Sequence, residues 1–578
     1  MKIRIALQTG CLILAAGFLF SGHAQSIGMT QLATNENGPF QLSGAWKAAQ
    51  SVMMHPEKSD AVKTTPVTDK ATGSLVGTSG AKATAALGLG DVILKLDFML
   101  SPGSSAAVKL PGGYDIRLND SWLSTKTDAN LCGSVGNLAP LQNVCKAPGL
   151  WQNLTVQYKK ATKNSAAQIE KLTLNGTVVL ENAFLTGLPT PETSLGLEVS
   201  SGTTAFRNVF YQLLNDARPL ALRQLTYTLY KAGNDRPRAL LPENIVKKDT
   251  TSVLTREWGI GSNSFYLVYD GQIEAAQEAD YLLELVYMAN ASLEIDGKTV
   301  SPYKWNDFLQ NYVPVNVHLT KGSHPFKLQY HKLTWRRPAL GIFVSAQGVR
   351  PYPLHLLSSV PEPDPMPLMA VNASGKAELI RSFIQHGEEK KKRTHCLSVG
   401  TPASVNYTLD LNRGSLLQFW KGNFANVTEM WYDRGEPQIL HPMGAANTTQ
   451  GQVDWAILTD MNAAWPDSLN ELVYKGYRLN AAGIPMVMYR HGAIEIADEL
   501  VPENGGLVRT VSGSVPNGYV RAVSGKNISA LEKGLYEVNG QSYYVRIDPK
   551  SKPIVRTVNG RQELLLPLNG TVRYSLIW

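Results

Sequence analysis

Four charged side chains lie close together in the short stretch of residues 104–122, which reads SSAAVKLPGGYDIRLNDSW. The alternating run after the Gly-Gly turn predicts a strand, and residues two apart on a strand share one face. Asp115 and Arg117 are therefore expected on one face, and Lys109 on the preceding strand can approach Asp115. Asp120 has an odd offset and faces the other way unless it already lies in a turn.

Such a cluster of charges has two interpretations. A carboxylate beside two cations can act as a base next to groups that stabilise a developing anion. The same residues can instead form a surface salt-bridge cluster on a sheet, where each exposed pair contributes about 0–1 kcal/mol. The periodicity alone favours the surface cluster.

The elements that carry these residues are predicted to be strands. After a lead-in rich in Gly, Ser and Thr at residues 26–85, apolar and polar residues alternate with a period of two from residue 90 to 214. The Asn-Gly pair in KLTLNGTVVLEN is the strongest short-range signal for a hairpin. We therefore predict an antiparallel β-sandwich for residues 25–214.

Two further regions are also rich in strand patterns. Residues 225–350 contain a second alternating series, and a proline-rich segment at residues 358–375 is expected to form an extended linker. Residues 376–578 alternate again, with DSLNELVYKG as the best helix candidate. The predicted fold class is all-β: a jelly-roll sandwich, a second β-sandwich module and a C-terminal β-rich domain.

The N-terminus predicts export. Residues 1–24 have a basic start, MKIR, then an apolar core of 16 residues, and then small residues at the positions that a signal peptidase reads, Gly22 and Ala24. An apolar core of this length is short for a membrane span, and no later stretch is long enough to cross. We expect a signal peptide with cleavage before Gln25, and a periplasmic, cell-surface or secreted protein.

Charge and cysteine content narrow the possible functions. The net charge of +8 is modest for 578 residues, and its densest run, EEKKKR at 388–393, carries two acids, so a solvated surface is favoured over a nucleic-acid site.

Cys132 and Cys145 lie in one loop, and an oxidising compartment predicts a disulfide between them, which leaves Cys396 unpaired. No Cys or His pair has the spacing of a zinc site, so we expect no metal and no cofactor.

Several blocks between residues 40 and 214 resemble the 3-keto-disaccharide hydrolase domain family, whose members are related in fold to the concanavalin-like sandwiches of glycoside hydrolase family 16. The blocks keep the family's order and spacing: LGDVILKLDFML, GSSAAVKLPGGYDIRLNDSW, APGLWQNLTVQY, LTLNGTVVLEN and FRNVFYQLL. The resemblance implies a concanavalin-like jelly roll and a hydrolase or lyase that cleaves 3-keto-glycosides.

The resemblance also implies roles for individual residues. In a 3-keto sugar the ketone acidifies the neighbouring C–H bond, so a base and an oxyanion stabiliser can cleave the glycoside by elimination followed by hydration. Asp115 would be the base, Glu198 or Asp120 a second carboxylate, and Lys109 and Arg117 the substrate ligands.

Two tryptophans are further candidates for contact with the substrate. Trp122 and Trp151 could stack on sugar rings, although a tryptophan on a strand more often belongs to a core. Whichever role the tryptophans have, the expected binding partner of the protein is a saccharide substrate or a glycan.

The chain departs from the family at several of these positions. Family members commonly carry Glu where Asp115 stands and Gln where Arg117 stands. They also carry a Gln/Asp/His block where this chain has LEVSSGTTAFRN, which leaves Glu198 and no histidine. A histidine-dependent mechanism is hard to build here, because His55 is the one histidine of residues 25–214. A glycan-binding protein without catalytic activity therefore stays open as an alternative.

The other two regions carry weaker resemblances. Residues 225–350 resemble the protective-antigen-type β module, which often binds sugars, through FYLVYDGQI, LEIDGKTV and HLTKGSHPFKLQYHK. Residues 376–578 resemble a β domain of large exported proteins that also contain haem-c and sugar-dehydrogenase modules, but the haem attachment motif is absent. A third hypothesis is therefore an assembly subunit that works beside a sugar 3-dehydrogenase.

Overall fold

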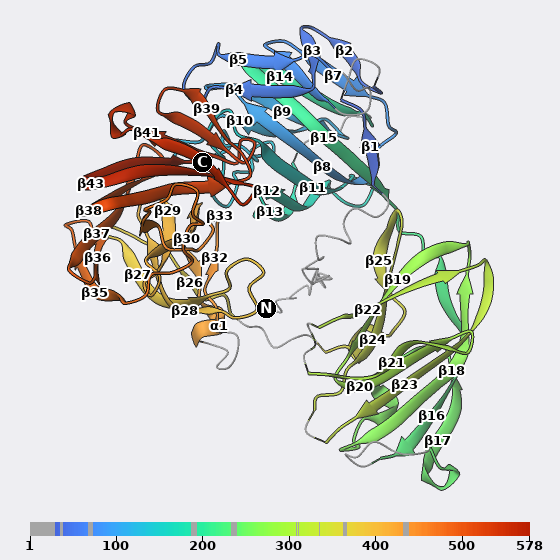
Figure 1. Cartoon of the computed structure of the whole chain (residues 1–578). Helices are drawn as coiled ribbons and strands as arrows, with labels where there is room; N and C mark the ends of the chain where they lie inside the picture. Colours follow the sequence, from blue (N-terminus) through green and yellow to red (C-terminus); the bar gives the residue numbers. More distant parts are fainter. Residues whose placement is uncertain are drawn as a thin grey trace, which may run out of the picture. The chain divides into compact units, whose positions relative to one another are not determined.

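The computed structural model describes residues 29–578 except 35–37, 68–72, 187–192, 233–239, 308, 310, 335, 362–366 and 432–437. The described chain divides into two compact units (Figure 1): Asn215–Val360 belong to the middle unit, and Gln31–Leu214 together with Pro361–Trp578 form the large unit. Nearly every element is an antiparallel strand, which confirms the predicted all-β class. The predicted signal peptide lies outside the described residues.

The first part of the large unit consists of two antiparallel sheets and a separate hairpin. The larger sheet contains, in spatial order, β13 (Thr177–Phe184), β12 (Gln168–Leu174), β11 (Gln152–Lys159), β8 (Asp91–Leu100), β15 (Thr203–Leu214), β6 (Ser74–Thr78) and β3 (Trp46–Ala49), with β1 (Thr30–Leu32) paired to β15. The smaller sheet contains β10 (Tyr114–Asn119), β9 (Ser105–Leu110), β14 (Leu195–Ser201), β7 (Lys82–Ala85) and β2 (Gln41–Ser43). The hairpin consists of β4 (Ser51–Met54) and β5 (Val62–Thr65).

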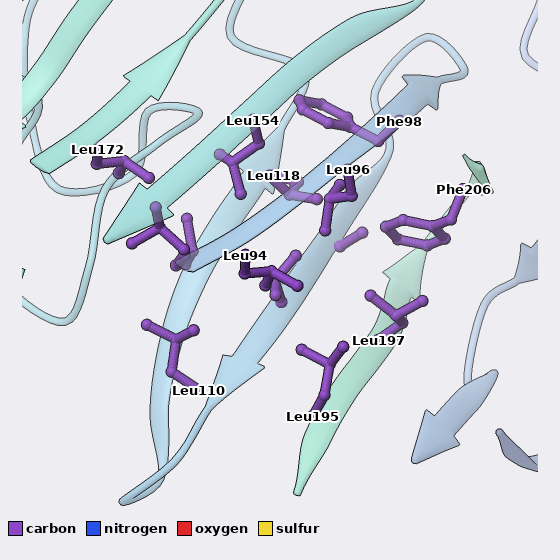
Figure 2. Packing of buried hydrophobic residues seen from close by; sticks show 14 of the residues in the cluster. Leu94, Leu96, Phe98, Leu110, Leu118, Leu154, Leu172, Leu195, Leu197 and Phe206 are labelled. Carbon is purple, nitrogen blue, oxygen red and sulfur yellow. The ribbon is translucent and has the colours of Figure 1, made fainter. Parts of the chain in front are cut away.

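Alternate residues of both sheets meet in one apolar core (Figure 2). Leu94 and Phe98 of β8 belong to the same buried cluster as Leu110 of β9, Leu118 of β10 and Leu197 of β14. Each fully buried side chain of this kind contributes about 1.5–3 kcal/mol relative to exposure. Because side chains alternate along a strand, the residues between these positions lie on the outward face of the smaller sheet.

The second part of the large unit, residues 361–578, has sheets and a core of its own. A short sheet contains β26 (Ala370–Val371), β31 (Ala425–Asn426) and β32 (His441–Pro442), and a five-stranded sheet contains β27 (Glu378–Ile384), β28 (Arg393–Gly400), β29 (Val405–Asp410), β30 (Ser415–Lys421) and β33 (Ala445–Thr448). The ten-stranded sheet contains β35 (Leu472–Leu479), β36 (Pro485–His491), β37 (Ile494–Glu503), β38 (Gly506–Gly525), β43 (Arg561–Ile577), β41 (Tyr543–Ile547), β40 (Leu535–Val538) and β39 (Ile528–Glu532), with β34 (Trp455–Ile457) on β38 and β42 (Ile554–Val558) on β43.

Helical structure is scarce among the described residues. The α-helix α1 (Thr428–Trp431) is a single turn, and short 3-10 turns occupy Pro242–Asn244, Glu257–Gly259, Leu357–Ser359 and Pro549–Ser551. The helix prediction for DSLNELVYKG is wrong, because its second half enters β35 and pairs with β36. Pairing with a neighbouring strand outweighs the local pattern here. No helix in the described part of the chain is long and apolar enough to span a bilayer.

Direct contacts join the two parts of the large unit. Gln142 Nε2 donates to the carbonyl oxygen of Met443 at 2.8 Å, and the Tyr544 hydroxyl donates to the carbonyl oxygen of Pro148 at 3.2 Å. Leu150 belongs to the apolar core of the second part. The sandwich of residues 31–214 is therefore supported from one side by the C-terminal part of the chain.

The middle unit is a second sandwich of antiparallel sheets around one core. The six-stranded sheet contains β17 (Ile245–Thr251), β16 (Leu220–Lys231), β18 (Phe265–Ala275), β23 (Gly322–Lys332), β20 (Ala289–Ile295) and β21 (Lys298–Asn306), and the four-stranded sheet contains β22 (Val313–Leu319), β19 (Ala279–Tyr287), β24 (Leu340–Ala346) and β25 (Val349–Pro353). The domain boundaries at 225–350, 358–375 and 376–578, and the resemblance to the protective-antigen type, stay predictions.

Candidate functional site

Four charged side chains form a connected cluster on the outward face of the smaller sheet. Strand pairing places Asp115 opposite Lys109, and Glu198 opposite Lys82. Lys109 Nζ lies 3.1 Å from each carboxylate oxygen of Asp115 and 3.1 Å from Glu198 Oε2, and Lys82 Nζ lies 2.9 Å from Glu198 Oε1. We call these four residues the charged cluster.

A glycine makes the central contact of the charged cluster possible. Gly196 on β14 lies opposite Lys109 on β9, and a Cβ at residue 196 would come within 2.9 Å of the Lys109 Cβ. The Lys109 side chain therefore lies across Gly196 and reaches Glu198, two residues further along β14. Ala107, which pairs with Glu198, is also a small residue.

Mutual pairing sets the charge states in the cluster. Burial disfavours the charge on Lys109, but hydrogen bonds to Asp115 and Glu198 outweigh burial and raise the pKa of Lys109. Burial also disfavours the Glu198 carboxylate, but hydrogen bonds from Lys82 and Lys109 outweigh it and lower the pKa of Glu198. Both groups are therefore charged near neutral pH. A lowered pKa disfavours the protonated form of Glu198, the form that the acid in ordinary two-carboxylate glycoside hydrolysis requires.

Solvent reaches the cluster unevenly. The Asp115 and Lys109 side chains are 41% and 36% exposed, whereas Glu198 is 20% exposed. A ligand can therefore approach Asp115 and Lys109 from solvent, while Glu198 is mostly covered. The accessible carboxylate of Asp115 thus lies beside the Lys109 ammonium. The more buried carboxylate of Glu198 helps to keep that ammonium charged.

Arg117 and Asp120, the other charged candidates, do not join the cluster. Arg117 Nη1 donates to the carbonyl oxygens of Ala129 and Gly136, the latter at 2.7 Å, so the guanidinium holds the neighbouring loop. Asp120 Oδ2 accepts a hydrogen bond from the backbone N–H of Gly103 at 2.8 Å, which stabilises a turn. Both side chains therefore already have structural partners, and their roles as substrate ligand and second carboxylate stay predictions.

The two tryptophans predicted to stack on sugars are packing residues. Trp151 is 9% exposed in a small core beneath the β4–β5 hairpin, and the Arg207 guanidinium lies 3.8 Å from its ring centroid. Trp122 packs against the core of the C-terminal part, and its carbonyl oxygen accepts a hydrogen bond from Lys421. Both rings therefore have packing partners, as is usual for a tryptophan on a strand, and a stacking contact with a sugar stays a prediction for both.

The structure brings Cys132 and Cys145 together as buried free thiols that are hydrogen-bonded to each other. The hydrogen bond from Cys132 lowers the pKa of the Cys145 thiol to about 7. The chain thus folds so that the two side chains meet, but no covalent bond joins them, and the disulfide stays a prediction. Cys396 is a buried free cysteine on β28, as predicted.

The four residues of the charged cluster lie between positions 82 and 198, within one sandwich. This part of the chain matches a known protein family. Residues 35–211 match the family model of the 3-keto-alpha-glucoside-1,2-lyase-like domain. All four residues of the charged cluster lie inside this lyase-like domain. The predicted resemblance is confirmed for this part of the chain.

Solved structures give weaker likenesses. Two crystal structures of candidate glycosyl hydrolases from Parabacteroides distasonis are 18% and 15% identical to this chain, each over 29% of it and over 99% and 88% of their own lengths. Their TM-scores are both 0.20, so they carry no argument about the lyase-like domain. No curated protein matches the chain.

Lys82 is the member of the cluster that sequence reasoning missed. It begins β7, a strand of four residues in the Gly/Ser/Thr-rich lead-in, and only the pairing of β7 with β14 brings it to Glu198. The alternation in KATA at residues 82–85 was a usable signal, because Ala83 and Ala85 are buried and Lys82 is exposed.

Proposed function

We propose that the lyase-like domain cleaves 3-keto-glycosides by elimination, with Asp115 as the base and Lys109 as the group that stabilises the enolate oxygen. One observation carries this proposal: an accessible carboxylate lies 3.1 Å from an ammonium inside the residues that match the family model. The carboxylate can accept a proton, and the ammonium is placed to stabilise the negative charge that this transfer creates.

The proposed reaction begins at the carbon next to the ketone. Asp115 removes the proton from C2, and the electron pair moves toward the oxygen on C3, where the Lys109 ammonium stabilises the enolate. The electrons then form the C1–C2 double bond as the bond from C1 to the leaving oxygen breaks. The leaving oxygen takes a proton from solvent, and addition of water to the double bond returns a free 3-keto sugar.

Glu198 serves as a positioning residue in this proposal, and Lys82 supports it. Its carboxylate binds Lys109 at a second point, so the ammonium stays charged and in place before substrate arrives. Fixed charges of this kind need no reorganisation during the reaction, which is the main source of electrostatic catalysis. Lys82 offsets the negative charge of Glu198.

A second candidate function is glycan binding without cleavage. One observation favours it: the Asp115 carboxylate is ion-paired with Lys109, so it must leave that ion pair before it can take a proton, a step that binding alone does not need. Export is part of either proposal and rests on the pattern of residues 1–24. No observation on this chain supports a sugar 3-dehydrogenase partner, and we do not propose one.

The proposal is tested by incubating the mature protein with 3-keto-trehalose and with a 3-keto-glucoside, and following released glucose and 3-ketoglucose. Asp115→Asn should lower turnover by roughly 10²–10⁴-fold, the usual contribution of a general base, and leave the melting temperature nearly unchanged. Asp60→Asn, an exposed carboxylate near the β4–β5 hairpin, serves as the matched control. An unchanged rate in Asp115→Asn would show that Asp115 is not the base. Absence of turnover by the wild type, together with measurable binding of oligosaccharides, would favour the second candidate function.

A further inference from the structure

A hollow of about 380 Å³ lies at one end of the lyase-like sandwich, beside the strand that carries Asp115. It is lined by Tyr114 of β10, by Leu185 directly after β13 and by residues 161–167, which connect β11 with β12. We call this site the edge hollow. An apolar cavity of about 150 Å³ is enough to hold benzene, so the edge hollow has room for an aromatic ring.

The edge hollow lies next to the free edge of β10, the outermost strand of the smaller sheet. Backbone hydrogen bonds of 2.8 and 2.9 Å and a β-bridge join residues 133–135 to Ile116 and Arg117, so the edge is covered from Ile116 onward. Tyr114 lies before this covered section and lines the hollow, one residue from Asp115. The hollow is therefore adjacent to the part of the edge that lies beside the proposed base.

The geometry of the proposed reaction directs the leaving group toward the same edge. Asp115 takes the proton from C2, and Lys109 stabilises the oxygen on C3. Because Lys109 lies on β9, the neighbour of β10 within the sheet, C3 points away from the free edge of β10. C1 is on the opposite side of C2, so the leaving group on C1 extends over the free edge, toward the edge hollow.

The lining of the edge hollow suits an aromatic group better than a second sugar. Its apolar walls consist of the Tyr114 ring, the Leu185 side chain and three alanines of residues 161–167. The hydroxyl groups of Thr162 and Ser165 are hydrogen-bonded to each other at 2.8 Å, and the Thr162 hydroxyl also accepts from a backbone N–H at 3.3 Å. These hydroxyls already have partners, whereas the apolar walls can contact the faces of an aromatic ring.

The charged cluster also favours a leaving group that departs without taking a proton. Hydrogen bonds to Lys82 and Lys109 lower the pKa of Glu198, and those to Asp115 and Glu198 raise the pKa of Lys109, so neither group readily donates a proton. A phenol has a pKa of about 10, whereas an alcohol is about as weak an acid as water, with a pKa of about 15.7. A phenolate therefore leaves far more readily than the alkoxide of a second sugar.

Elimination from an aryl 3-keto-glycoside balances without a further reactant. Asp115 holds the proton from C2 while the bond from C1 to oxygen breaks, and the aglycone leaves as a phenolate. The phenolate then takes a proton from water, and Asp115 releases its proton to solvent. Lys163 is a charged residue of the lining, so the hollow presents a positive charge to the departing anion.

We propose that the edge hollow is the leaving-group subsite of the lyase-like domain and that it selects 3-keto-glycosides with an aromatic aglycone. This assignment of the substrate class rests on the proposed function, in which Asp115 and Lys109 act on the sugar half of the substrate. The edge hollow binds the other half, and Tyr114 and Leu185 determine the specificity for it.

The experiment compares kcat/KM of the mature protein for three substrates: the phenyl and methyl 3-keto-α-glucosides and 3-keto-trehalose. Ala166→Trp fills the hollow with an indole ring, and Ala166 is exposed, so the substitution leaves the core intact. The ratio of kcat/KM for the phenyl over the methyl glucoside should fall by about 10–100-fold, the loss expected when an apolar ring is no longer buried. Ala493→Trp, at an exposed alanine between β36 and β37, is the matched control and should keep the wild-type ratio.

A second pair of variants tests the aromatic wall. The Tyr114 ring packs on the sandwich core, with its centroid 6.4 Å from that of Tyr158, so melting temperatures are measured alongside kcat/KM. Tyr114→Leu removes the ring and should lower the phenyl-to-methyl ratio, whereas Tyr114→Phe keeps the ring and should retain the wild-type ratio. A general loss of stability would lower turnover of both glucosides and would not change their ratio.

The outcomes separate the leaving-group subsite from the proposed base. An unchanged ratio in Ala166→Trp, or a higher kcat/KM for 3-keto-trehalose than for the phenyl glucoside, would overturn the subsite and leave Asp115 as the base. Absence of turnover of all three substrates would overturn the proposed function, and the subsite with it.

Discussion

Lys109 and Glu198 are joined across the position of Gly196, with 3.1 Å between Lys109 Nζ and Glu198 Oε2. The two residues lie on neighbouring strands, β9 and β14, that are far apart in the sequence. The contact adds to the hydrogen bond from Lys82 in lowering the pKa of Glu198 and to the hydrogen bond with Asp115 in raising the pKa of Lys109. It therefore links the two ion pairs of the charged cluster, Lys109–Asp115 and Lys82–Glu198.

Gly196→Ala should disturb this contact selectively. The added methyl group would come within 2.9 Å of the Lys109 Cβ, so the lysine side chain must move away from Glu198. We expect turnover of a 3-keto-glucoside to fall by about 10–100-fold, because small displacements of a catalytic group have effects of this size. Stability should fall by no more than about 1–3 kcal/mol. Gly90→Ala is the control, since nothing lies within 4 Å of its added methyl group, and an equal loss in both variants would contradict the explanation.

Glu198→Gln should lower the melting temperature at neutral pH but not in acid. The pKa of Glu198 is lowered in the folded protein, so its stabilising contribution is present above the ordinary value of 4.5 and is lost as the pH falls through the folded-state pKa. The melting temperatures of wild type and variant, measured from about pH 3 to about pH 8, should therefore converge at the acidic end. A gap that stays constant with pH would show that the lost contact is not ionic.

Trp151→Ala should affect folding rather than substrate binding. The indole ring is buried beneath the β4–β5 hairpin and packs under Arg207, so its removal leaves a cavity. We expect a loss of about 3–5 kcal/mol in the free energy of unfolding by urea, with an unchanged KM. Trp431→Ala, which removes a side chain that is 56% exposed, is the comparison and should cost much less. A raised KM in Trp151→Ala without loss of stability would restore the sugar-stacking role.

Lys421→Met should leave the protein at least as stable at neutral pH. Lys421 is buried beside Trp122, and burial lowers its pKa to about 8. Between about pH 8 and the ordinary value of 10.5 the unfolded chain binds more protons, so the wild type gains stability as the pH rises. Below that range the buried ammonium lowers the stability of the wild type by a net amount on the order of 3 kcal/mol. The free energy of unfolding by urea should rise more in the wild type than in the variant between about pH 7 and about pH 10. An equal change in both proteins would refute the charge explanation.

The local pattern around Asp115 was enough to predict part of the charged cluster. Alternation along residues 104–119 correctly indicates two strands joined by a tight turn, and the register of a hairpin brings Lys109 to Asp115. Glu198 entered only through the family resemblance, and Lys82 was missed. Glu198 lies on β14 and Lys82 on β7. β14 pairs with both β9 and β7, and the spacing of residues in the sequence does not predict these pairings.

Three other candidate residues have partners in the structure that the sequence did not indicate. Alternation shows that a residue points to one face of a strand, but not what covers that face. Trp151 lies beneath a hairpin, Trp122 packs against the C-terminal part, and the Arg117 guanidinium is held by loop carbonyl oxygens. The sequence pattern did not indicate that these side chains are covered, because each covering segment is either far away in the sequence or a loop without regular structure.

The sequence by itself determined the all-β class, the hairpin that carries Lys109 and Asp115, and the family of residues 35–211, because periodicity and block order are local properties. Only the tertiary structure decided which charges meet and in which ionisation state. Those outcomes depend on strand order, on the glycine opposite Lys109 and on burial, and each of these is set by segments far apart in the chain. Hydrophobic packing of two sheets selects the strand order, and the charges on the outward face follow from it.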